Sequence, residues 1–367
     1  MSQLGIVLGS ALIVVGAILN IYSLKYINVV AKETESNELT DIGEKIGKSR
    51  GRLIVTFLLF ATCIVPLIIY IDQSTTYFEN VLKHFGYIID IDKIRLGVAS
   101  VIACLCMTFR TPDKLKIVNT VGLMCILAFT SYVVYFMINN IASLSFASIK
   151  FYELSMKSLT SLSIISFAYC SQFSILSITS NIESVSRCNR VIEISNIISC
   201  VVYLVTGICG CIAVPDVGTK FFPDIPITNA SVLISASLGI VNIMTYPIIM
   251  IPTLQSYQFL QSLIYNTPKS ALKDAFDILC LVMVCFAGSY LVASNDAYLY
   301  VLFFFCGSCV MFALPAIFYF IIMKKELNIK SYLVIIMKCI LTIFGIFMGF
   351  YTIKNDILQE KNITNKT

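Results

Sequence analysis

Residues 158–180 read SLTSLSIISFAYCSQFSILSITS, and this stretch decides how the rest of the chain is interpreted. It is long and apolar enough to cross a bilayer as a helix. Its middle, residues 166–172, gathers hydroxyl, phenol and amide groups that lipid cannot solvate, so these groups should face a cavity or another helix. Two interpretations stay open. Either the helix unwinds within 168–172 and its freed backbone groups bind a solute, or an unbroken helix packs through its polar side chains, since no Gly or Pro forces a break.

The composition is that of a polytopic membrane protein. Of 367 residues, 58% are hydrophobic and 13% are charged, and the mean hydropathy is +0.87. These values lie far outside the range of soluble domains. The chain has one His, and its 14 cysteines lie almost entirely in apolar segments, where they act as small hydrophobes. We therefore predict no metal centre.

Apolar runs of about 20 residues predict about ten spanning helices. Nothing between them is long enough to fold as a separate domain, so we expect one transmembrane domain over 1–367. The expected spans cover residues 4–29, 53–71, 94–110, 115–139, 158–182, 192–214, 229–262, 275–293, 296–323 and 332–354.

Basic residues alternate from one connection to the next. They cluster near 25–52, 110–116, 187–190, 269–273 and 324–330, whereas the other connections are sparser and more acidic. The positive-inside rule makes the basic connections cytoplasmic. The chain would then start outside with only three residues before its first span, so we expect a further span upstream of this sequence.

The only long charged connection is residues 32–52. Thr40 and Asp41 can cap a short helix, and Gly47 and Gly51 can end one. This pattern predicts a cytoplasmic amphipathic turn before the next span, although a solvated loop explains the charges equally well.

Polar side chains inside the spans give the candidate binding groups. On the interrupted stretch they are Ala168, Tyr169, Cys170, Ser171 and Gln172, for a substrate. Asn242 and Thr245 lie three residues apart on one helical face and can offer oxygens to a sodium ion. Hydrogen bonds between helices remain the alternative role for both sets.

The spans are expected to contain no deep Asp or Glu, which argues against a proton relay through a buried carboxylate. Glu193 and Lys338 lie near cytoplasmic ends and can extend to the interface. A neutral cavity of this kind suits a zwitterion. With one His, in an outer connection, and no acidic pair in the membrane, we predict that the protein is not an enzyme.

Five stretches resemble the amino acid/auxin permease family of secondary amino acid transporters. TDIGEKIGKSRGR at 40–52 resembles the family's loop after its second helix, and SFAYCSQFSILS at 166–177 lies where the family has its broken sixth helix. TYPIIMIP at 245–252 resembles part of the eighth helix. FCGS at 305–308 and LPAIFY at 314–319 resemble the tenth.

The resemblance implies an all-α transporter of the LeuT type, with two inverted five-helix repeats. In this alignment residues 1–139 form an incomplete first repeat without the family's first helix, 157–323 form the second repeat, and 324–367 form a final helix and tail. Ser171 and Gln172 stand where the family often has His-Pro, so a breaking proline is absent.

We therefore expect a secondary transporter that moves amino acids, driven by a sodium or proton gradient, with no other cofactor. A transport-inactive amino-acid sensor, or a degenerate or truncated paralogue, is the alternative. The expected partners are the amino acid and the lipid bilayer, with no nucleic acid, and the oligomeric state stays open. The membrane is the plasma membrane or a vacuolar or lysosomal membrane.

Overall fold

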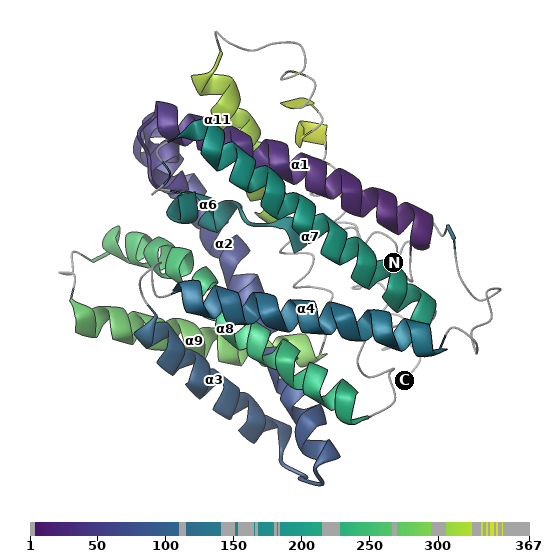
Figure 1. Ribbon diagram of the computed structural model, residues 1–367. Coiled ribbons are helices and arrows are strands. Elements are labelled where there is room, and N and C mark those ends of the chain that lie inside the picture. Colours follow the sequence, from purple (N-terminus) through teal and green to yellow (C-terminus); the bar gives the residue numbers. More distant parts are fainter. Residues whose placement is uncertain are drawn as a thin grey trace, which may run out of the picture.

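The computed structural model describes residues 4–109, 115–140, 151–152, 165, 168–179, 182, 184–214, 228–265, 270–294 and 306–324, with single positions between 332 and 347. Every regular element in these ranges is a helix. Five of these helices are long and apolar enough to cross a membrane. Within the described ranges, the protein is an all-helical bundle (Figure 1).

The first two helices are joined at one end of the bundle by a short charged connection. Helix α1 spans Ile6–Glu33, and α2 spans Leu39–His84. Helix α2 is interrupted at Lys48, whose φ of 54° and ψ of −149° are not helical, so a short helix precedes the long one. This confirms the amphipathic turn predicted within 32–52. Its N-cap is Glu38, two residues before the predicted cap.

Two glycines let the short helix of α2 fold back against the long one. A Cβ added at Gly51 would lie 2.2 Å from the carbonyl oxygen of Gly43, and one added at Gly43 would lie 2.7 Å from a methyl group of Val55. No real Cβ tolerates such distances. Close backbone approach therefore requires glycine at both positions.

The long helices pack in a continuous bundle. Helix α2 makes its most extensive contact with α8, and α3 and α9 contact both of them. Helix α4 packs against α7 and α8, and α7 packs against α1, so these helices run side by side in Figure 1. Their bounds are Ile91–Thr108 for α3, Leu115–Asn140 for α4, Val185–Ala213 for α7, Asn229–Ser262 for α8 and Ala271–Ser294 for α9.

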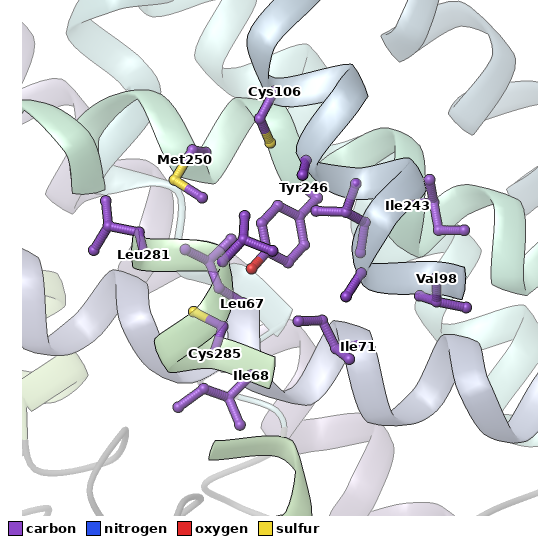
Figure 2. Close-up of a cluster of buried hydrophobic side chains, with 14 of the residues drawn as sticks. Leu67, Ile68, Ile71, Val98, Cys106, Ile243, Tyr246, Met250, Leu281 and Cys285 are labelled. Atoms are coloured by element: carbon purple, nitrogen blue, oxygen red, sulfur yellow. The ribbon is translucent and has the colours of Figure 1, made fainter. Parts of the chain in front are cut away.

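The largest apolar cluster joins α2, α3, α8 and α9. Figure 2 shows the ring of Tyr246 at its centre, with Leu67, Ile71 and Cys285 on one side and Cys106 on the other. Tyr246 is fully buried. In a membrane, such close packing of side chains holds helices together, because lipid is as apolar as the side chains themselves. These four helices therefore form one closely packed unit, which we call the scaffold.

A π-helical turn leads directly into helix α11. The turn, η5, spans Cys309–Ala313, and α11 follows over Leu314–Ile322. A π turn contains about one more residue than an α turn and leaves a carbonyl out of line. The hydroxyl of Ser23 on α1 donates to the Met311 carbonyl, so this irregular turn is tied to α1. Farther along, the rings of Tyr26 and Tyr319 stack 4.0 Å apart.

Five of the predicted spans coincide with helices long and apolar enough to cross a membrane, but one of these helices ends far from the predicted boundary. The span predicted over 332–354 lies mostly outside the described residues. The span predicted over 53–71 belongs to α2, which continues to His84. Asp72, expected in an outer loop, is therefore inside the helix and buried, so the prediction of no deep carboxylate was wrong. It is accommodated because the guanidinium of Arg95 on α3 lies 3.3 Å from it. Asp277 of α9 is also buried, bonded by the amides of Gln258 and Gln261.

The prediction that Lys338 reaches the interface was also wrong. Its side chain is fully buried, and its ammonium lies 4.3 Å from the centre of the Tyr26 ring. A cation over an aromatic face is attracted by the ring quadrupole, which offsets part of the loss of hydration. Glu193, in contrast, stays partly exposed and forms an ion pair with Lys25 between α7 and α1.

Candidate functional site

The apolar stretch at residues 158–180 is interrupted where predicted. Ala168 and Tyr169 are helical, Cys170 and Ser171 are not, and helix α6 begins at Gln172 and runs to Thr179. This confirms the predicted break for residues 168–172, while Ser166 and Phe167 lie outside the described residues.

Side chains replace the backbone bonds that the break removes. The side-chain carbonyl of Gln172 accepts from the Ser171 N–H at 3.0 Å, and the hydroxyl of Tyr203 on α7 donates to the Ala168 carbonyl at 3.0 Å. The Ser171 carbonyl accepts from the Ser174 N–H at 3.2 Å. Because buried backbone groups must be paired, these contacts make the break stable without a proline.

Gln172 also fastens the break to α1. Its amide nitrogen donates to the side-chain oxygen of Asn20 at 2.7 Å and lies 3.4 Å from the hydroxyl of Ser23. Asn20 in turn donates to Asn196 of α7 at 2.7 Å. Gln172, Asn20 and Ser23 are all essentially inaccessible to solvent. This buried polar network joins the break, α1, α7 and, through Ser23, the π turn η5.

Tyr169 points away from the break into an apolar pocket. It is buried in a cluster with Ile13 and Ala17 of α1, its ring lies edge-on to that of Tyr203, and Gly16 approaches it closely. Its hydroxyl has no hydrogen-bond partner among the described polar groups. Tyr169 therefore packs the broken segment against α1 and does not line a binding site in this structure.

A cavity of about 390 Å³ opens in front of the break. The broken segment contributes Ala168, Cys170 and Ser171 to its wall, and α6 contributes Phe173 and Ser174. The facing helices contribute Pro66 and Tyr70 of α2, Tyr203 of α7, and Thr245, Ile248 and Ile249 of α8. We call it the central cavity. It has the size and mixed lining of a small-molecule site.

The structure brings only part of the predicted site into the central cavity. Ala168, Cys170, Ser171 and Thr245 line it, although they come from distant parts of the sequence. The Thr245 hydroxyl also donates to the Val241 carbonyl at 2.7 Å. Tyr169 and Gln172 lie behind the break. Asn242 instead donates to the side-chain oxygen of Gln73 on α2 at 3.4 Å.

Several residues that the sequence analysis missed support the site. Asn20, Ser23 and Asn196 hold the break, and Tyr70 and Tyr203 line the cavity. A signal for the first three was available: Asn20 and Ser23 share a face inside a long apolar span, and polar groups in such places have partners. The tyrosines carry no comparable signal, because aromatic residues occur throughout the spans.

Two further pockets lie between α6 and the charged connection that joins α1 and α2. A narrow pocket of about 50 Å³ shares Phe173 with the cavity and lies beside Glu38, Arg52 and Gln255. A wider pocket of about 330 Å³ follows, and it shares Leu176 with the narrow one. Gln255 of α8 donates to Glu38 at 3.1 Å, and both residues line the narrow pocket.

The fold is similar to that of solved transporters of the LeuT type. The inward-facing structure of Mhp1 matches with a TM-score of 0.60 and 11% identity over 97% of this chain and 86% of that one. A manganese transporter from Eremococcus coleocola matches with a TM-score of 0.60 and 12% identity over 100% of this chain and 86% of that one. At such identities these matches concern the fold.

A comparison with curated proteins found no match. The family model described as transmembrane amino acid transporter protein matches residues 1–358. That match covers nearly the whole chain and agrees with the broken helix, the apolar bundle and the shared fold. The chain is a membrane protein that belongs to the transmembrane amino acid transporter family.

Proposed function

We propose that this chain is a secondary active transporter that moves amino acids through the central cavity by alternating access, driven by a sodium or proton gradient. The observation that carries the proposal is the interruption at Cys170 and Ser171, which borders the cavity. Interrupted helices of this kind form the mid-membrane site in secondary transporters.

The break offers complementary groups to the two charges of an amino acid. The first N–H groups of α6 have no partner within the helix and carry the positive end of its dipole, which favours a carboxylate. The carbonyl groups on the other side of the break suit an ammonium group, and a carbonyl already bonded, as in Ala168, keeps a second lone pair. Cys170 and Ser171 border the substrate directly in this proposal, with Tyr169 and Gln172 supporting them from behind.

The coupling ion is proposed to bind beside this site on α8. Thr245 contributes its hydroxyl from the cavity wall, and Asn242 contributes its amide oxygen one turn away. Pro252 lacks an N–H, which leaves the carbonyl of Ile248 without its usual donor close to the cavity. Such neutral oxygens suit sodium. The proposed location is the plasma membrane or a vacuolar or lysosomal membrane.

Uptake of radiolabelled amino acids into proteoliposomes that contain the full chain tests the proposal. A sodium gradient and a proton gradient are imposed separately, and we expect one of them to drive accumulation. Cys170→Trp should abolish uptake by filling the cavity, whereas Cys104→Trp, on the exposed face of α3, should not. Amino-acid binding without uptake under either gradient would identify a sensor and contradict the transport proposal.

A further inference from the structure

We propose that the substrate is a neutral amino acid with a bulky apolar side chain, and that Ile248 and Ile249 of α8 with Tyr70 of α2 select it. This inference rests on the proposed function and names the substrate class of the same site. It follows from how polar and apolar groups are divided over the cavity wall.

Groups that can bond the ammonium and carboxylate of an amino acid lie on the side of the broken segment. The broken segment supplies backbone groups and the hydroxyl of Ser171, and the hydroxyl of Tyr203 also faces this segment. The opposite side is made by α2 and α8. It presents Pro66, Ile248, Ile249 and the ring of Tyr70, and its polar groups are the hydroxyls of Tyr70 and Thr245, so we call it the apolar side. A substrate whose ammonium and carboxylate groups meet the break therefore directs its side chain at the apolar side.

The uncharged wall of the cavity opposes the binding of amino acids with charged side chains. None of the described residues that line the cavity carries a charge. Arg95 and Asp72 lie deeper in the scaffold and pair with each other, and Glu38 and Arg52 line the narrow pocket instead. A lysine or glutamate side chain would lose its hydration here and gain no ion pair, which strongly opposes binding.

Size favours a large side chain over a small one. The cavity measures about 390 Å³, and the isoleucines and Tyr70 present broad apolar surfaces. Glycine would leave these surfaces uncovered, whereas each added methylene that meets them strengthens binding, by about 10-fold or more when the fit is good. We therefore expect affinity to rise from glycine to leucine or phenylalanine.

Ligand-dependent stabilisation of the purified full chain measures binding without requiring transport. Unfolding is followed with a thiol-reactive fluorophore, because Cys63, Cys106 and Cys285 are buried and become accessible on unfolding. We expect leucine or phenylalanine to raise the Tm at concentrations about 100-fold lower than lysine or glutamate require. Equal shifts by charged amino acids would overturn the inference and leave the proposed function intact. The absence of a shift with every amino acid would overturn both.

A substitution at Ile248, with a matched control, tests whether this residue selects the substrate. Ile248→Asp places a carboxylate at the apolar side and should bring lysine to within about 10-fold of leucine. Ile248→Asn has nearly the same shape without the charge and should weaken leucine without admitting lysine. If both variants keep the wild-type order of amino acids while folding normally, Ile248 does not select the substrate and the inference fails.

Discussion

Arg95 of α3 and Asp72 of α2 form an ion pair inside the scaffold, with the guanidinium 3.3 Å from the carboxylate. Both side chains are about 95% buried, and Arg95 also lies 4.4 Å from the centre of the Tyr290 ring on α9. One pair of charges thus connects three scaffold helices.

Removing one charge of this pair should be far worse than removing both. We expect Arg95→Met to lower the free energy of unfolding by about 3–5 kcal/mol, because it removes the positive charge that faces the buried Asp72 carboxylate. The double variant Asp72→Leu with Arg95→Met should recover most of that loss. A double-mutant cycle of thermal stability checks this. Additive losses would mean that the two charges do not depend on each other.

Gly51→Ala should destabilise the junction between the short and long parts of α2. The added methyl group would meet the Gly43 carbonyl at 2.2 Å, which forces backbone movement that costs about 1–3 kcal/mol. Gly47→Ala is the matched control, because no atom lies within 4 Å of the Cβ it would add. We expect that variant to be neutral or slightly stabilised in the same thermal assay. Equal losses at both positions would contradict the packing explanation.

Asn20→Ala should weaken substrate binding as well as stability. It leaves the amide of Gln172 without its main partner, so the break at Ser171 loses its support. Asn28→Ala is the control: it removes a similar bond between α1 and α7, to Asn189, away from the break. Each variant should cost about 1–3 kcal/mol of stability, and only Asn20→Ala should raise the KM for uptake. An equal KM in the two variants would show that the network is purely structural.

The contact between Glu38 and Gln255 should open during transport. It is a single hydrogen bond at the edge of the bundle, worth about 0.5–3 kcal/mol, so it can break readily. With Glu38→Cys and Gln255→Cys, a short reversible thiol crosslinker should stop uptake, and a reductant should restore it. The same crosslinker between Gln258→Cys and Asp274→Cys joins two scaffold helices and should leave uptake unchanged. Unimpaired uptake with Glu38 and Gln255 positions joined would exclude a gate there.

Impermeant thiol labelling of intact cells should distinguish the two ends of the bundle. In a variant without the native cysteines, Lys45→Cys should stay unlabelled from outside, because the positive-inside rule makes its connection cytoplasmic. Ile88→Cys, in the exposed turn between α2 and α3, should be labelled. Both side chains are accessible, so burial does not explain a difference. The reverse pattern would invert the topology.

The sequence was sufficient to predict the break but not the directions of its side chains. Polar residues in an apolar run marked 168–172, because such groups need partners in a membrane. Cys170 and Ser171 are not helical, however, so the helical repeat cannot predict the directions in which Tyr169 and Gln172 point relative to each other. Their roles behind the break depend on α1 and α7, which lie far away in the sequence.

The end of α2 was unpredictable for a related reason. Asp72 and Gln73 are typical of a loop when only neighbouring residues are considered. Their partners, Arg95 and Asn242, belong to other helices. Because long-range pairing makes these polar residues acceptable inside a helix, local hydropathy placed the end of the helix about 13 residues too early.

The π turn at Cys309–Ala313 determines which way the side chains of α11 point around the helix axis. One residue advances an α-helix by about 100°, so tightening this turn to ordinary α geometry would swing α11 by roughly that angle. Tyr319 would then leave the ring of Tyr26, and with it the aromatic stack under the ammonium of Lys338. A deletion of one residue here would therefore act at a distance, as a change of helix orientation and not as a local defect.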